Sequence, residues 1–90
     1  MFFSLFFKFI NFIKLNPNEA AAFYESAIIY SNNQEYKLSL EYSKIASELD
    51  DKNKWYLEFY AQNLYNNRDF YKAIKVYKLL IKHHPIALGI

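Results

Sequence analysis

The feature that most constrains the fold is an apolar pattern that recurs about every 34 residues along the chain. The pattern occupies three positions in each helix-like unit, and these are Phe70, Ile74 and Leu80, then Tyr36, Leu40 and Ala46, and finally Phe2, Phe6 and Phe12. Self-similarity at a fixed period of this length is typical of stacked helix pairs, because one pair alone cannot bury its apolar face. The sequence therefore predicts an array of helix pairs.

The composition favours helices over strands. Of the 90 residues, 53% are apolar and 21% are aromatic, which is enough to build the core of one small domain. The chain contains a single glycine and two prolines, so it offers little material for the tight turns of a β fold. We therefore predict an all-α domain.

The residue types argue against catalysis, cofactors and metal binding. The chain has no cysteine, phosphate-binding loop, serine elbow or nucleophile–base pairing. His83 and His84 are the only histidines, and adjacent helical residues point about 100° apart, which prevents them from sharing a metal ion within one helix. We predict no enzymatic activity, no cofactor and no metal site.

The net charge is too small to favour nucleic acid as a partner. Eleven basic and nine acidic residues give a formal net charge of +2, and they are spread along the chain. Domains that bind nucleic acid normally carry a strongly basic surface. An RNA-binding helical-repeat protein is therefore a distant alternative.

Helix signals divide the chain into five segments, over residues 2–15, 19–30, 35–49, 55–65 and 69–83. Breaks are expected near residues 16–18, 31–34, 50–53 and 66–68. In the fourth segment, Leu57, Ala61 and Leu64 form the stripe expected to face inward. Ala27 and Ala61 are expected where two helices approach closely, because a small side chain leaves room for the neighbouring backbone.

The phenylalanine-rich segment 2–15 has more than one interpretation. It is shorter than the about 20 apolar residues that span a bilayer, and no basic residue precedes its apolar run, as a signal peptide would require. Its repeat phase favours a packed helix, while a membrane-surface helix and a partner-binding helix stay open as alternatives. Phe3, Phe7 and Ile10 lie outside the expected core stripe, so we expect them to form a second contact surface.

The repeated units resemble the tetratricopeptide-repeat family, whose pattern is Trp-x2-Leu-Gly-x2-Tyr, then Ala-x3-Phe, then Pro. The matching positions are Phe23-x2-Ser26-Ala27-x2-Tyr30 and Leu57-x2-Tyr60-Ala61-x2-Leu64, then Leu5-x3-Phe9, Ser39-x3-Ser43 and Ala73-x3-Tyr77, with prolines at Pro17 and Pro85. The resemblance implies a right-handed solenoid of antiparallel helix pairs with about five helices. Its units would be a half-repeat at 1–17, full repeats at 20–53 and 54–87, and a truncated start of a further helix at 88–90. Ser39 and Ser43 replace an apolar pair, which predicts loose packing in the middle of the array.

The resemblance also implies a function, namely binding of a peptide or partner helix on the concave face formed by the first helix of each pair. The residues carried onto that face are Ala21, Tyr24, Glu25, Ile28 and Ser31, with Trp55, Glu58, Phe59, Gln62 and Tyr65. Glu25 and Glu58 have the wrong charge to hold a C-terminal carboxylate, so an apolar or aromatic anchor with basic flanks is the better match. For Trp55, packing between repeats and a role in binding are both open.

The expected partners are therefore a protein or peptide, with self-association through the open ends of the array as an addition. The alternative function is a membrane-surface scaffold anchored by residues 2–15, with Lys8 and Lys14 at headgroup level. The compartment is not fixed by the sequence, although the first function favours the cytoplasm and the alternative a membrane surface.

Overall fold

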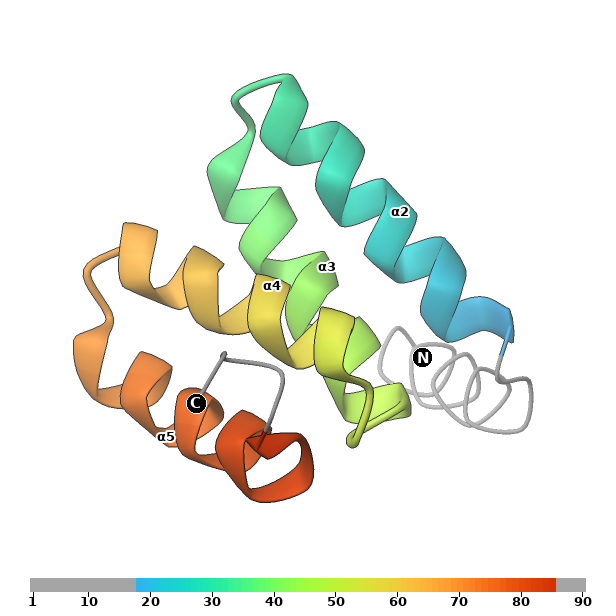
Figure 1. Cartoon of the computed structure of the whole chain (residues 1–90). Helices are drawn as coiled ribbons and strands as arrows, with labels where there is room; N and C mark the ends of the chain where they lie inside the picture. The colour runs from blue at the N-terminus through green and yellow to red at the C-terminus, as the bar shows by residue number, and fades with distance from the viewer. Residues whose placement is uncertain (1–17, 86–90) are drawn as a thin grey trace, which may run out of the picture.

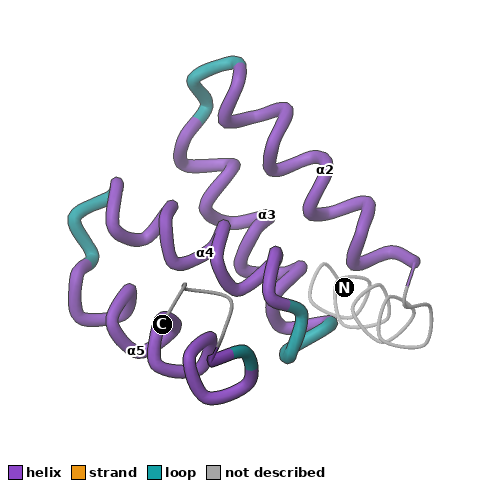
Figure 2. Tube along the Cα trace, viewed as in Figure 1, coloured by secondary structure: helices purple, strands orange, loops and turns teal. Residues whose placement is uncertain are grey.

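The computed structural model describes residues 18–85. This part of the chain is all-α and contains no strand, which confirms the predicted class (Figures 1 and 2). Its helices are α2 (Asn18–Asn32), α3 (Tyr36–Leu49), α4 (Lys54–Asn66) and α5 (Phe70–His83). The expected helix over 2–15, the half-repeat 1–17 and the segment 88–90 lie outside the described residues.

The helices pack in chain order, with α2 against α3, α3 against α4, and α4 against α5. Figure 1 shows two hairpins of neighbouring helices, α2 with α3 and α4 with α5. The boundaries lie within a residue or two of those expected from the sequence for all four helices.

The two hairpins have the same turn geometry at equivalent positions of the repeat. Gln34 and Arg68 both adopt the left-handed conformation, with φ of 65° and 63°. In each turn the next N–H reaches back five residues, from Glu35 to the Tyr30 carbonyl at 2.8 Å and from Asp69 to the Leu64 carbonyl at 2.9 Å. This 6→1 bond with a left-handed residue is the Schellman way of ending a helix. The turn conformation therefore recurs along the backbone with the same period as the sequence pattern.

The apolar core is centred on the second hairpin. It consists of Leu57, Ala61 and Leu64 of α4 with Ala73, Val76 and Leu80 of α5. The predicted inward stripe of α4 is thus confirmed. Ala27 and Ala61 are both completely buried, in agreement with the close helix contacts expected there.

Some positions of the repeating pattern are not buried. The exposed fraction is 64% for Tyr36, 49% for Phe70 and 53% for Ile74. Tyr36 and Phe70 are the first residues of their helices, where fewer neighbours reach them. Because α5 buries the face that carries Ala73 and Leu80, Phe70 and Ile74 remain on its flank. The apolar pattern therefore has the correct period, but some of its positions lie outside the core.

Candidate binding surface on helices α2 and α4

Aromatic rings join the first helices of the two hairpins. The Tyr24 ring of α2 lies 4.8 Å from the Tyr56 ring and 5.7 Å, edge-on, from the Phe59 ring of α4, measured between centroids. Such aromatic pairs contribute about 0.5–1.5 kcal/mol beyond the area that they bury. Partial burial, followed by the nearby Asp50 carboxylate, raises the pKa of the Tyr56 hydroxyl above its ordinary value. The ring contacts therefore join α2 to α4.

The start of α4 is fixed by a side-chain cap. Asn53 accepts hydrogen bonds through its side-chain oxygen from the backbone N–H groups of Trp55 at 3.0 Å and Tyr56 at 3.2 Å. These N–H groups would otherwise lack a partner within the helix. The cap thereby positions the first turn of α4, which carries Trp55.

Next to these rings lies a hollow of about 160 Å³, which we call the aromatic hollow. It is lined by Tyr24, Trp55, Glu58, Phe59 and Gln62. A closed cavity of about 150 Å³ can hold a benzene molecule, so the aromatic hollow has room for one large apolar side chain. The Trp55 side chain is 59% exposed, and the Lys54 amine lies 4.8 Å from the centre of its ring. Trp55 is thus available at the rim for a partner.

The structure brings together five of the ten residues predicted for the concave face, and those five line the aromatic hollow. The other five lie elsewhere, and among them Ala21 and Ser31 are half-buried on α2. Glu25 is exposed on α2, and Ile28 is half-buried on the same helix. The Tyr65 ring packs edge-on against Phe70 of α5, with 5.2 Å between centroids. The expected second surface of Phe3, Phe7 and Ile10 lies outside the described residues.

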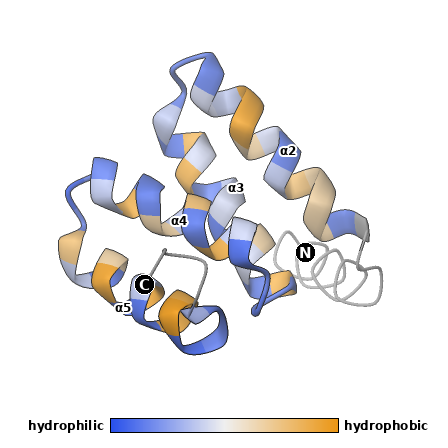
Figure 3. Cartoon of the chain, viewed as in Figure 1, coloured by the Kyte–Doolittle hydropathy of each residue, from blue (hydrophilic) through white to orange (hydrophobic). Residues whose placement is uncertain are grey.

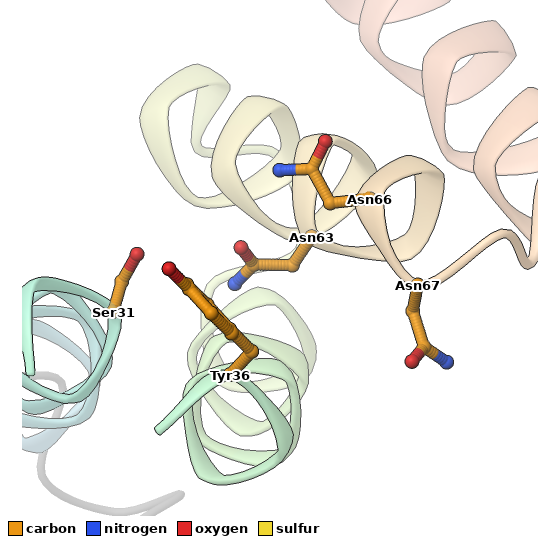
Figure 4. A pocket seen from close by; sticks show the side chains of 5 residues that line it. All are labelled: Ser31, Tyr36, Asn63, Asn66 and Asn67. Atoms are coloured by element: carbon orange, nitrogen blue, oxygen red, sulfur yellow. The ribbon is translucent and has the colours of Figure 1, made fainter. Parts of the chain in front are cut away.

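A larger pocket of about 450 Å³ lies toward the ends of α2 and α4, and we call it the amide pocket (Figure 4). Its lining residues are all uncharged and comprise Ser31, Tyr36, Asn63, Asn66 and Asn67. Only Ser31 was expected on the binding face. Asn66 and Asn67 lie at the break expected near residues 66–68, and the same pair of asparagines one repeat earlier, Asn32 and Asn33, is the sequence signal that this corner recurs.

Behind the amide pocket, Asn63 connects α4 to α3. Its side-chain amide nitrogen donates to Ser39 Oγ at 3.1 Å and to Ser43 Oγ at 3.0 Å. Ser39 in turn donates to the Ala27 carbonyl of α2 at 2.8 Å, and Ser43 donates to the Leu40 carbonyl at 3.0 Å. Both serines are essentially fully buried. The expected loose packing at this position is replaced by hydrogen bonds that join three helices.

This network also fixes the orientation of the Asn63 amide. Each serine proton is used on a backbone carbonyl, so both serine oxygens can only accept, and they accept from the Asn63 amide nitrogen. The Asn63 carbonyl oxygen is then turned away from the serines. The network therefore fixes the orientation of one of the side chains that line the amide pocket.

The histidines at the end of α5 have a structural contact. His84 Nε2 donates to the backbone carbonyl of Lys52, which ties the C-cap of α5 to the loop between α3 and α4. Within residues 18–85, no three histidine or carboxylate side chains lie close enough to hold a metal ion. No helix in the same range is long and apolar enough to cross a membrane.

Comparisons with known proteins do not assign the chain to a family. No protein-family model matches it, and neither curated proteins nor solved structures give a significant match.

Proposed function

We propose that the chain is a non-catalytic protein-interaction module built as a short tetratricopeptide-like array. In this proposal, residues 20–53 and 54–87 form two antiparallel helix pairs of a right-handed solenoid, and α2 and α4 line its binding face. The support is the recurrence of the hairpin turns at the repeat period, together with the ring contacts between α2 and α4. A stack of this kind presents an extended surface to a partner.

The observation that carries the proposal is the aromatic hollow with an exposed Trp55 at its rim. Tryptophan and tyrosine are enriched among residues that dominate binding energy, and a pocket that desolvates one anchor is the usual setting. Glu58 lines the hollow and Glu25 is exposed nearby on α2, whereas Lys54 is held over the Trp55 ring. The matching partner is a peptide or helix with one large apolar side chain flanked by lysine or arginine.

Trp55 provides the test, because it is the only tryptophan in the chain. The probe is a synthetic peptide that carries one phenylalanine between lysine pairs, and its matched control carries glutamates in place of the lysines. We expect a saturable change in Trp55 emission with the lysine peptide and a markedly weaker response to the glutamate peptide.

A matched pair of variants locates the effect. Glu58→Lys places the opposite charge in the hollow and should weaken binding of the lysine peptide about two- to fivefold, as expected for an exposed charge pair. Glu41→Lys makes the same change at an exposed position of α3 and should leave binding unchanged. An equal response to both peptides, or an equal effect of both variants, would contradict the proposed recognition.

A further inference from the structure

The exposed side of α5 carries two parallel rows of side chains. One row is apolar and consists of Phe70, Ile74, Tyr77 and Ile81, and the other, one residue further along, consists of Tyr71, Lys75, Lys78 and Lys82. Both rows follow the spacing 4, 3, 4, which keeps residues on one side of a helix. Ile74 is 53% exposed and Ile81 is 42% exposed, whereas Tyr77 is half-buried and packs against the core, so Ile74 and Ile81 are the members of the apolar row that are available to a partner. Figure 3 shows apolar and hydrophilic residues alternating along α5.

Charge divides the described chain into two unlike parts. Residues 68–85 contain five basic side chains and one acidic one, which gives +4. Residues 18–67 contain four basic and eight acidic side chains, which gives −4. Within α5 itself all charged residues are lysines apart from a terminal histidine, and the acidic Asp69 just before it lies 3.8 Å from Lys72. The lysine row therefore faces solvent without a compensating carboxylate on its own helix.

The α5 rows have the chemistry that the α2–α4 surface is proposed to bind. They combine large apolar side chains with flanking lysines, whereas the aromatic hollow combines three aromatic side chains with Glu58 and Gln62. The same chain thus carries both halves of a complementary pair on different faces.

We propose that α5 of one copy docks on the α2–α4 surface of a second copy, with Ile74 entering the aromatic hollow and the lysine row facing Glu58 and Glu25. This inference rests on the proposed function, since it names the partner of that surface. The two faces differ, so the contact is head-to-tail and leaves one face free at each end of a dimer. Charged pairs of this kind are screened by salt.

Two blocked variants test the head-to-tail contact in the full chain by sedimentation velocity. Glu58→Lys blocks the α2–α4 surface, and Ile74→Lys blocks the apolar row of α5. Both substitutions introduce lysine, so the two variants gain no new pair of opposite charges with each other. Both positions are exposed, and circular dichroism verifies that both variants are folded. We expect the parent mass to rise with concentration at low salt. Glu58→Lys alone should associate about two- to fivefold more weakly, Ile74→Lys alone about tenfold more weakly, and an equimolar mixture of the two variants should form a dimer.

Leu79→Lys is the control, because Leu79 is 44% exposed on a different flank of α5. This variant should associate like the parent. A parent that stays monomeric at every concentration, or that binds anionic vesicles only as a monomer, would overturn the inference. Association that persists in both blocked variants would also overturn the inference, because it would show that the copies meet through another segment. A mixture of the two variants that forms no dimer would overturn it as well.

The peptide experiment separates this inference from the proposed function. Ile74→Lys leaves the aromatic hollow intact, so it should still bind the lysine peptide and change its Trp55 emission. Peptide binding without self-association refutes only the inference. Loss of both peptide binding and self-association refutes the proposed function as well.

Discussion

Replacing Asn63 by alanine tests the hydrogen-bond network that joins three helices. The substitution removes two hydrogen bonds to serine hydroxyls, of 3.1 Å to Ser39 and 3.0 Å to Ser43, together with a longer one of 3.4 Å to the Ser39 carbonyl, at a partly buried site. Each bond to a hydroxyl contributes about 1 kcal/mol net, so the free energy of unfolding should fall by about 2 kcal/mol. In a domain of this size that corresponds to a melting temperature lower by about 8–16 °C.

The assay is urea unfolding followed by far-ultraviolet circular dichroism. Asn66→Ala is the matched control, because it makes the same change on the same helix at an exposed position, and it should alter stability by no more than about 0.5 kcal/mol. Combining Asn63→Ala with Ser39→Ala gives a double-mutant cycle, for which we expect a coupling free energy of about 1 kcal/mol.

Two results would refute the reasoning. If Asn63→Ala is no more destabilising than Asn66→Ala, the amide does not hold α4 to α3. If the effects of Asn63→Ala and Ser39→Ala simply add, the two side chains do not interact, and the buried serines must be satisfied in another way.

Three further predictions concern packing, backbone and pH. Ala61→Leu should cost about 1–3 kcal/mol, because Ala61 is completely buried between helices, and unchanged urea unfolding would contradict that packing. Arg68→Gly should raise the free energy of unfolding by about 0.5–1 kcal/mol, because glycine adopts positive φ without strain. As a control, Gln62→Gly in the middle of α4 should lower the free energy of unfolding by about 1 kcal/mol. Burial is the main cause that raises the pKa values of Tyr56 and Tyr60, so the folded state favours their protonated forms. The free energy of unfolding should therefore fall above about pH 10, where these tyrosines ionise in the unfolded chain. A free energy of unfolding that stays constant there while tyrosinate absorbance rises would contradict this.

The helices and their ends could be predicted because they depend on local signals. Asparagine pairs mark the ends of α2 and α4, an aspartate pair marks the end of α3, and the spacing of Leu57, Ala61 and Leu64 marks the inward face of α4. The left-handed residues could not be identified in the same way, because Gln34 and Arg68 stand where glycine would be the usual signal.

The lining of the aromatic hollow was predictable where it comes from a single helix. Trp55, Glu58, Phe59 and Gln62 share a side of α4 because they are spaced by three and four residues. The amide pocket was missed because its side chains come from three different helices or their ends, which no periodicity within one segment brings together. Ser39 was expected to loosen the packing because its hydrogen-bond partner Asn63 lies 24 residues away on another helix, where no local pattern shows it.

The measurement that tests the proposed binding surface most directly is an amide chemical-shift map of the full chain titrated with the lysine-flanked phenylalanine peptide. The aromatic hollow predicts that the largest changes occur at Trp55, Glu58, Phe59 and Gln62, with Tyr24 changing in parallel and the Trp55 indole signal shifting at the same peptide concentration. Changes centred on α3 or α5, or changes scattered over all four helices with the Trp55 indole unmoved, would contradict it.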